Sequence, residues 1–207
     1  MPDGQLRLYQ PGEDIRRIHW KATALQGRPI LRNTIPEPKH EIVLLPETRP
    51  ELPEGEEGWL TEDAVTEGTL MIADYFLRSR ITMRVVLDER RSLVMTSPAD
   101  YDRLYGWCSG QLFTAARRPD ELLEEDVTRQ GAGSSYILLI WTLDELFLRR
   151  VSRCIDLGAD VTCIYVGADS GASQLAQAER RMHFHMSTDR TDIYALLAGS
   201  GEEGSEA

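Results

Sequence analysis

Residues 136–141 read Tyr-Ile-Leu-Leu-Ile-Trp, and this is the longest strongly apolar run in a chain of 207 residues. It is too short to span a membrane, which takes about 20 apolar residues. A continuous apolar run of this length is typical of a strand that is buried on both faces of a parallel sheet. We therefore predict that residues 136–141 form a strand at the centre of a sheet.

Strand and helix patterns alternate on both sides of this run. The other predicted strands are 42–45, 81–87, 92–95, 161–166 and 183–186, of which 92–95 returns antiparallel. Predicted helices are 61–78, one beginning at Ser97, 119–129, one capped by Thr142–Glu145 and ended by Gly158, 170–181, and one ending near 197. This order predicts an α/β fold with a doubly wound, mostly parallel sheet and helices on both faces, as in Rossmann-like proteins.

Two of these helices carry more specific expectations. Ser97 and Asp100 form a capping box, which marks the start of a helix. We expect that helix to pack on the sheet through one apolar face, made of Tyr101, Leu104, Tyr105, Cys108 and Leu112. The helix at 119–129 is strongly acidic, and we expect it to be exposed.

Charge is distributed unevenly along the chain. The formal net charge is −11, but residues 1–40 carry seven Lys or Arg and four Asp or Glu. The acidic remainder argues against nucleic acid as the main ligand, because basic side chains supply most of that affinity. It also argues against a basic membrane-docking surface.

The three cysteines, Cys108, Cys154 and Cys163, form no C-x-x-C pair, so neither a zinc site nor a redox motif is indicated. We expect them to be core residues in a reducing compartment.

Basic and aromatic residues crowd a short stretch near the N-terminus. Pro11–Asp14 reads as a turn whose last residue can cap a helix. The residues that follow include Arg17, His19, Trp20 and Lys21. This cluster can bind an acidic partner, or it can dock the N-terminal arm onto the acidic body; we weigh the two equally.

The stretch Tyr9–Leu25, YQPGEDIRRIHWKATAL, resembles the signature of the domain-of-unknown-function-58 family. Glu13 and Leu25 depart from the family pattern, which has aspartate and arginine there. The resemblance implies a von Willebrand factor A-like sheet, a membrane anchor elsewhere in the full-length protein, a cytoplasmic location, and a MoxR-type AAA+ ATPase as partner. The matching positions, expected to bind a partner or to hold the structure, are Tyr9, Pro11, Gly12, Asp14, Arg17, His19, Trp20 and Lys21.

From the resemblance and the patterns together we predict three regions. Residues 1–40 are a signature arm packed on the main domain, 41–198 the von Willebrand factor A-like domain, and 199–207 a disordered acidic tail.

Factor A domains often hold Mg²⁺ through a D-x-S-x-S motif after the first strand, completed by residues from other loops. The matching stretch here is Pro46–Pro50, in which proline replaces both the aspartate and the last serine. Only Thr48 is in place, while Glu47, Glu51 and Asp144 offer further oxygens. We predict a degenerate site with no bound metal, and no cofactor.

Three short motifs indicate little chemistry. His183 and His185 share one face of a strand, and we interpret them as an edge-strand polar pair. Gly106–Gly110 imitates a nucleophile elbow around Cys108, but its neighbours have helical spacing. Gly167–Gly171 reads as an ordinary turn. The loops where such a sheet would hold a ligand are 46–58, 142–145 and 167–171.

These observations predict a non-enzymatic domain for protein interaction or assembly, with no nucleic-acid partner. The alternative is a hydrolase that uses His19 with Asp14, or His183 with His185, as acid–base groups. No Ser, Cys or Asp stands in a catalytic context that would favour the alternative.

Overall fold

The structure is a computed structural model that describes residues 6–8, 23, 28, 30–32, 41–110, 112–130, 133–167, 182–187 and 193. The chain divides into two compact units, Met1–Lys39 and His40–Ala207. In the first, strands β1 (Leu6–Leu8) and β2 (Ile30–Arg32) pair antiparallel. Of the signature Tyr9–Leu25, only Thr23 lies within the described residues.

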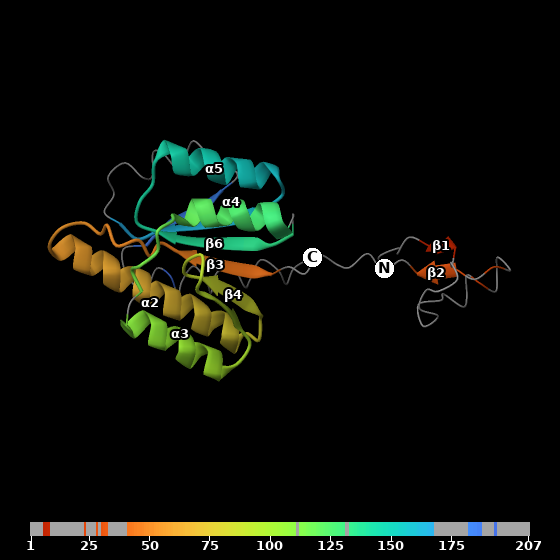
Figure 1. The fold of residues 1–207 in the computed structure, drawn as a ribbon, viewed down its shortest axis with the longest axis horizontal. Coiled ribbons are helices and arrows are strands. Elements are labelled where there is room, and N and C mark those ends of the chain that lie inside the picture. Colours follow the sequence, from red (N-terminus) through yellow and green to blue (C-terminus); the bar gives the residue numbers. More distant parts are fainter. Residues whose placement is uncertain are drawn as a thin grey trace. The chain divides into compact units, whose positions relative to one another are not determined.

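The second unit is built on one six-stranded sheet (Figure 1). Its strands are β3 (Ile42–Pro46), β4 (Met83–Val86), β5 (Ser92–Met95), β6 (Ser135–Ile140), β7 (Asp160–Tyr165) and β8 (His183–Met186). They lie in the order β5-β4-β3-β6-β7-β8, and every neighbouring pair is parallel except β4 with β5. The sheet thus begins with β3 in its middle. The chain adds β4 and β5 on one side and then crosses to add β6, β7 and β8 on the other. This is the doubly wound, mostly parallel, Rossmann-like α/β sheet that the sequence predicts.

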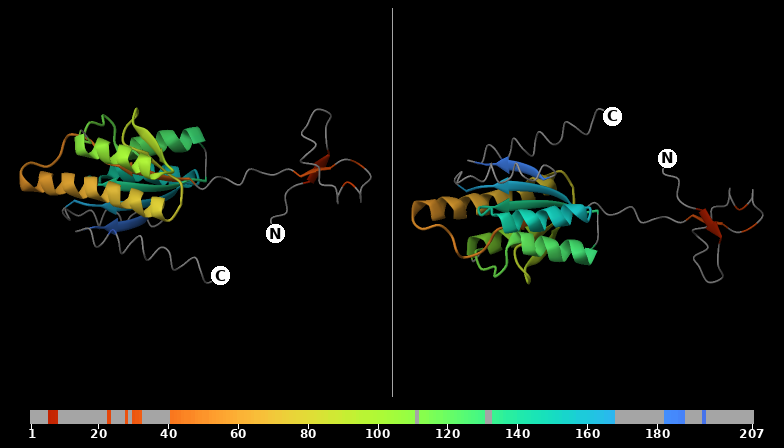
Figure 2. Two further views of the ribbon diagram at one scale, coloured as in Figure 1. Left: turned by 90° about the horizontal axis from the view of Figure 1, so that it is seen from below. Right: turned by 90° about the horizontal axis from the view of Figure 1, so that it is seen from above.

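Helices cover both faces of the sheet, as expected (Figures 1 and 2). One face carries α2 (Glu56–Arg78) and α3 (Pro98–Gly110), and the other carries α4 (Pro119–Gln130) and α5 (Glu145–Asp156). None of the helices in the described part of the chain has the length and apolar character needed to cross a bilayer. Of the helices predicted at 170–181 and before 197, and of the tail 199–207, only Ile193 lies within the described residues.

The two central strands are buried on both faces, which explains their continuous apolar sequence. In β6, Tyr136 and Leu138 belong to the core under α4 and α5, whereas Leu139 belongs to the core under α2 and α3. Because side chains of a strand alternate between faces, a central strand needs apolar residues at every position. The predicted central place of residues 136–141 is confirmed, since β6 lies between β3 and β7.

The expectation that the acidic helix at 119–129 is exposed is wrong. The residues of α4 that are buried are Pro119, Asp120, Leu122, Leu123, Asp126 and Val127. Burial is possible because arginines from other elements neutralise the acids. The carboxylate of Asp126, for example, accepts hydrogen bonds from Arg84 at 2.8 Å and from the hydroxyl of Tyr136 at 3.0 Å.

Most helix starts and ends follow local sequence signals. Asp100 closes the predicted capping box, accepting from the backbone N–H of Ser97 at 2.9 Å. Gly158 follows α5 with a φ of 94°, which favours glycine. However, α2 begins at Glu56, five residues before the predicted start at Thr61. Tyr105 is 55% exposed instead of packing on the sheet.

Cys154 and Cys163 are buried, as expected of core residues, and Cys108 is partly buried. The reducing compartment inferred from them stays a prediction.

Two helical glycines should respond in opposite ways to replacement by alanine. A Cβ at Gly58 in α2 would lie 2.0 Å from the carbonyl oxygen of Pro53, whereas a Cβ at Gly106 in α3 meets nothing within 4 Å. Gly58→Ala should therefore destabilise the protein by about 1–3 kcal/mol through overpacking. Gly106→Ala should stabilise it by about 0.5–1 kcal/mol through helix propensity. Urea denaturation measures both, and a stabilised Gly58→Ala variant would contradict the close approach.

Candidate functional site

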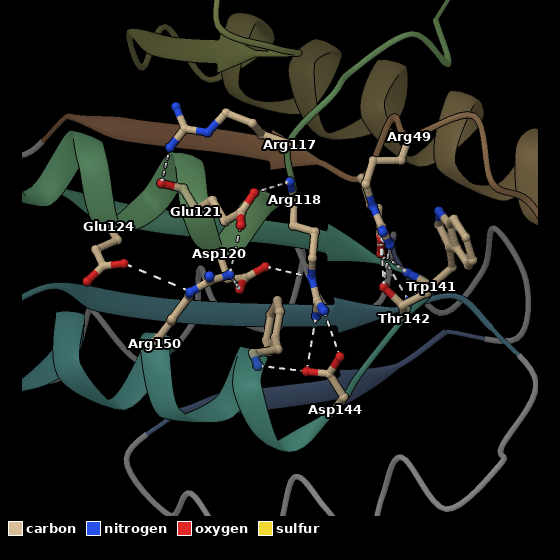
Figure 3. A network of polar contacts seen from close by, with 12 residues as sticks. Arg49, Arg117, Arg118, Asp120, Glu121, Glu124, Trp141, Thr142, Asp144 and Arg150 are labelled. Atoms are coloured by element: carbon tan, nitrogen blue, oxygen red, sulfur yellow. Dashed lines mark hydrogen bonds and ion pairs between the residues drawn. The ribbon is translucent and has the colours of Figure 1, made fainter.

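The carboxyl ends of β3 and β6 form the candidate site. These strands are neighbours, and the winding of the sheet reverses between them. In doubly wound sheets, a crevice at this reversal is where ligands bind. Three segments come together at this edge: the residues after β3, the residues after β6, and the arginines that precede α4 (Figure 3).

Glu47, the first residue after β3, fills this crevice with its own carboxylate. The side chain is only 1% exposed. Its Oε2 accepts from the backbone N–H groups of Trp141 and Thr142 at 3.1 and 3.0 Å, and its Oε1 accepts from the Thr142 hydroxyl at 2.6 Å. Arg49 completes the set with an ion pair and an Nε donor at 3.1 Å. The carboxylate thus occupies the backbone donors that an anionic ligand would otherwise use.

Arg49 is partly exposed and covers the Glu47 carboxylate like a lid. Its guanidinium lies 5.5 Å from the centre of the Trp141 ring and donates to the Thr142 hydroxyl at 3.0 Å. Its side chain is 19% exposed. A guanidinium stacked on an indole and paired with a buried carboxylate is held in one orientation. This edge therefore presents a rigid surface.

Arg118 lies beside this lid and bridges two carboxylates (Figure 3). It donates to Asp144 at 2.6 Å and to Asp120 at 3.0 Å, and its guanidinium lies 5.8 Å from the ring of Phe147. Burial, the largest influence, lowers the pKa of Arg118, but the Asp144 hydrogen bond and the charges of Asp120, Asp144 and Glu47 together raise it above its ordinary value. Arg118 is therefore a fixed cation whose charge is already compensated.

Asp144, which lies within the predicted capping segment Thr142–Glu145, is the N-cap of α5. Its side chain accepts from the backbone N–H of Phe147 at 2.8 Å, and its backbone has the extended conformation typical of an N-cap. The hydrogen bond from Arg118 is the main cause that lowers the pKa of Asp144, while partial burial opposes it.

Asp120 extends the network of ion pairs into the interior of the domain. It is fully buried, and its two oxygens accept from Arg118 at 3.0 Å and from Arg150 at 2.9 Å. Arg150 also pairs with Glu121 at 3.1 Å, and on the surface Arg153 pairs with Glu124 at 3.0 Å. An open groove lined by charged side chains of α4 and by Arg150 runs over this surface. Alternating charges therefore connect the carboxyl edge to the α4–α5 surface.

The residues of the predicted degenerate metal site form hydrogen bonds with other groups of the protein. The Thr48 hydroxyl is buried and donates to the carbonyl of Leu87 at 2.7 Å, while Asp144 is held by Arg118 and by its capping bond. Glu47 is enclosed by its donors, and Glu51 is exposed. No group of three or more His, Cys, Asp or Glu side chains is placed to hold a metal in the segments that the structure describes. The donor set at this edge does not fit a divalent cation.

The two histidines of β8 lie as the sequence suggests. β8 is an edge strand, and His183 and His185 are exposed on one face of it. Burial, followed by the neighbouring His183, lowers the pKa of His185. Cys108 lies within α3 rather than on a turn, and burial raises the pKa of its thiol to about 11, so it is not a thiolate at neutral pH.

The second unit is a Rossmann-like α/β domain whose ligand edge is closed by its own side chains. Residues 5–93 of this chain match the family model described as "Protein of unknown function DUF58". The match includes Tyr9–Leu25 and extends from there through β3, α2 and β4, which confirms the resemblance. A comparison with curated proteins gives no match.

Some of the predicted site residues lie at the carboxyl edge, and others lie outside the described residues. Thr48 and Asp144 both lie at the carboxyl edge, but as structural anchors. The signature positions Tyr9, Pro11, Gly12, Asp14, Arg17, His19, Trp20 and Lys21 lie outside the described residues. Sequence reasoning missed the roles of Arg49, Arg118, Asp120 and Arg150. The adjacent arginines 117 and 118, placed just before an acidic helix, were the one available signal.

Removal of the Glu47 carboxylate should be costly. Glu47→Ala leaves Arg49 unpaired and two backbone N–H groups without an acceptor, so we expect a loss of about 3–5 kcal/mol in the free energy of unfolding. Glu51→Ala, an exposed glutamate in the same loop, is the matched control and should change stability by less than about 0.5 kcal/mol. Urea denaturation compares them, and equal effects would show that Glu47 holds nothing together.

The Arg118–Asp144 pair predicts a specific acid dependence. The pKa of Asp144 is lowered in the folded protein, so its stabilising effect is complete above the unfolded value of about 3.9 and is lost as pH falls through the folded value. Asp144→Asn keeps a good N-cap but removes the charge. Stability measured against pH should fall less steeply below about pH 4 in this variant. An unchanged acid limb would refute the pairing.

Proposed function

We propose that this chain is a non-enzymatic protein-interaction and assembly domain of a membrane-anchored bacterial protein. It works at the cytoplasmic face of the membrane with a MoxR-type AAA+ ATPase. The family match over residues 5–93 supports this assignment, because the associations implied by the resemblance are of this kind.

The closed carboxyl edge is the observation that carries the proposal. At the position where Rossmann-like domains bind small ligands, the carboxylate of Glu47 takes up the backbone donors, and Arg118 is shared between Asp120 and Asp144. Groups that are bonded to one another in this way are poor acid–base catalysts but good elements of a rigid recognition surface. The geometry therefore favours binding over chemistry.

A von Willebrand factor A-like identity is part of the same proposal. The central parallel strands, the antiparallel edge strand β5 and the helices on both faces support it. Thr48 and Asp144 stand where such a domain supplies metal ligands, and here they bond to the protein itself. In this proposal, the residues of the degenerate metal site keep their positions but stabilise the domain instead of holding a metal.

Binding to the purified ATPase tests the proposal. The wild-type chain should bind, and Trp20→Ala/Lys21→Ala should lose binding without a change in melting temperature if the signature recognises the partner. Arg103→Ala/Tyr105→Ala removes an exposed cation and an exposed aromatic from α3 and is the matched control, which should bind normally.

Two results would count against this function. One is a well-folded wild-type chain that does not bind the ATPase. The other is hydrolysis of ester or phosphate substrates that is lost in His19→Ala or in His183→Ala/His185→Ala, which would favour the hydrolase alternative.

A further inference from the structure

The first turns of α2 leave two large apolar side chains in solvent. Trp59 is 71% exposed and Leu60 is 62% exposed. The helix has 23 residues and spans about 34 Å, whereas β3, with five residues, spans about 17 Å. Its N-terminal part therefore projects past the carboxyl end of the sheet (Figure 1). A tryptophan beside a leucine in such a position is costly to leave in water unless something covers it.

Acidic side chains surround these two residues on the helix. Glu56 and Glu62 lie three residues before and after Trp59, and Asp63 lies three residues after Leu60, spacings that make neighbours on a helix surface. We call Glu56, Glu57, Trp59, Leu60, Glu62 and Asp63 the α2 patch. All six are exposed.

The acids of the α2 patch lack the compensation found elsewhere on this domain. Glu56 and Glu57 lie in the first turn, where they favour the helix dipole, but Glu62 and Asp63 lie beyond it. Among the ion pairs of the described segments none involves these four residues, whereas the acids of α4 are paired with arginines. Residues 50–77 contain eight acidic and no basic side chains. The patch is therefore an uncompensated negative surface around an apolar centre.

We propose that the α2 patch docks a basic segment of a partner protein, one that carries an apolar side chain among its lysines or arginines. This rests on the proposed function as an interaction domain and names the chemistry of the partner. The apolar side chain packs on Trp59 and Leu60, an arginine stacks on the indole, and the cations pair with Glu62 and Asp63. Charge complementarity of this kind also accelerates association.

Synthetic peptides test the proposal on the full chain. The probe is a fluorescein-labelled amphipathic Lys/Leu peptide, compared with a Lys/Ser peptide of equal charge and a Glu/Leu peptide of equal apolar content. We expect the Lys/Leu peptide to bind most tightly. Its affinity should fall at least about tenfold in Trp59→Ala/Leu60→Ala and in Glu62→Lys/Asp63→Lys.

Matched controls separate this patch from the general acidity of the chain. Tyr105→Ala/Leu157→Ala removes an aromatic and a leucine that are exposed elsewhere, and Glu89→Lys/Asp102→Lys reverses two exposed acids elsewhere. Both controls should bind the Lys/Leu peptide like wild type. Melting temperatures of all variants should match, because the substituted side chains are exposed.

Three outcomes would overturn the inference. They are equal binding of the Lys/Ser peptide, equal weakening in the controls, or self-association of the chain that is lost only in the patch variants, which would make a second copy the occupant. Binding to the ATPase uses a separate probe. If the ATPase binds and no peptide preference exists, the docking chemistry fails while the proposed function stands. If the peptide preference exists and the ATPase does not bind, that partner fails instead.

Discussion

The carboxylate of Glu47 is the interaction on which this edge of the domain depends. β3 and β6 are adjacent, but the segments that follow them lead to helices on opposite faces, so backbone N–H groups at their ends would face an open crevice. Glu47 supplies the missing acceptor to Trp141 and Thr142, and it fixes Arg49 at the same time. A buried carboxylate is tolerated only where such donors surround it. In other doubly wound sheets this crevice binds ligands. Here the Glu47 carboxylate fills it and holds the ends of the strands and their loops together.

The second constraint is the buried pairing of Asp120 with Arg118 and Arg150. Such a pair gains little net stability, but loss of one partner would leave an uncompensated buried charge. Because Arg118 also reaches Asp144, this pairing connects the start of α4 with the start of α5. The position of both helices over the sheet is therefore specified by polar contacts as well as by apolar packing, and it is coupled to the carboxyl edge.

Much of the fold could be predicted from local signals, whereas the site could not. Residues 136–141 revealed the central strand, and Ser97 with Asp100 revealed a helix start, because these signals lie within a few residues of each other. Glu47 lies in a proline-rich acidic loop, and its backbone donors are 94 and 95 residues away, so no local signal revealed its structural role. Thr48 resembled a metal ligand, but its true acceptor is 39 residues distant. The acidity of α4 suggested exposure, because Arg84 and Arg150, which pair with its buried Asp126 and Asp120, come from distant parts of the chain.

Hydrogen exchange at the backbone amides of Trp141 and Thr142 reports whether the carboxyl edge of the sheet is closed. If the Glu47 carboxylate closes the crevice, both amides exchange as slowly as those within β6, through global unfolding only. Exchange of either amide at the rate of an unstructured peptide would mean that the carboxylate does not hold these donors. The edge would then be open to solvent and available to a ligand, and Glu47 would not close it.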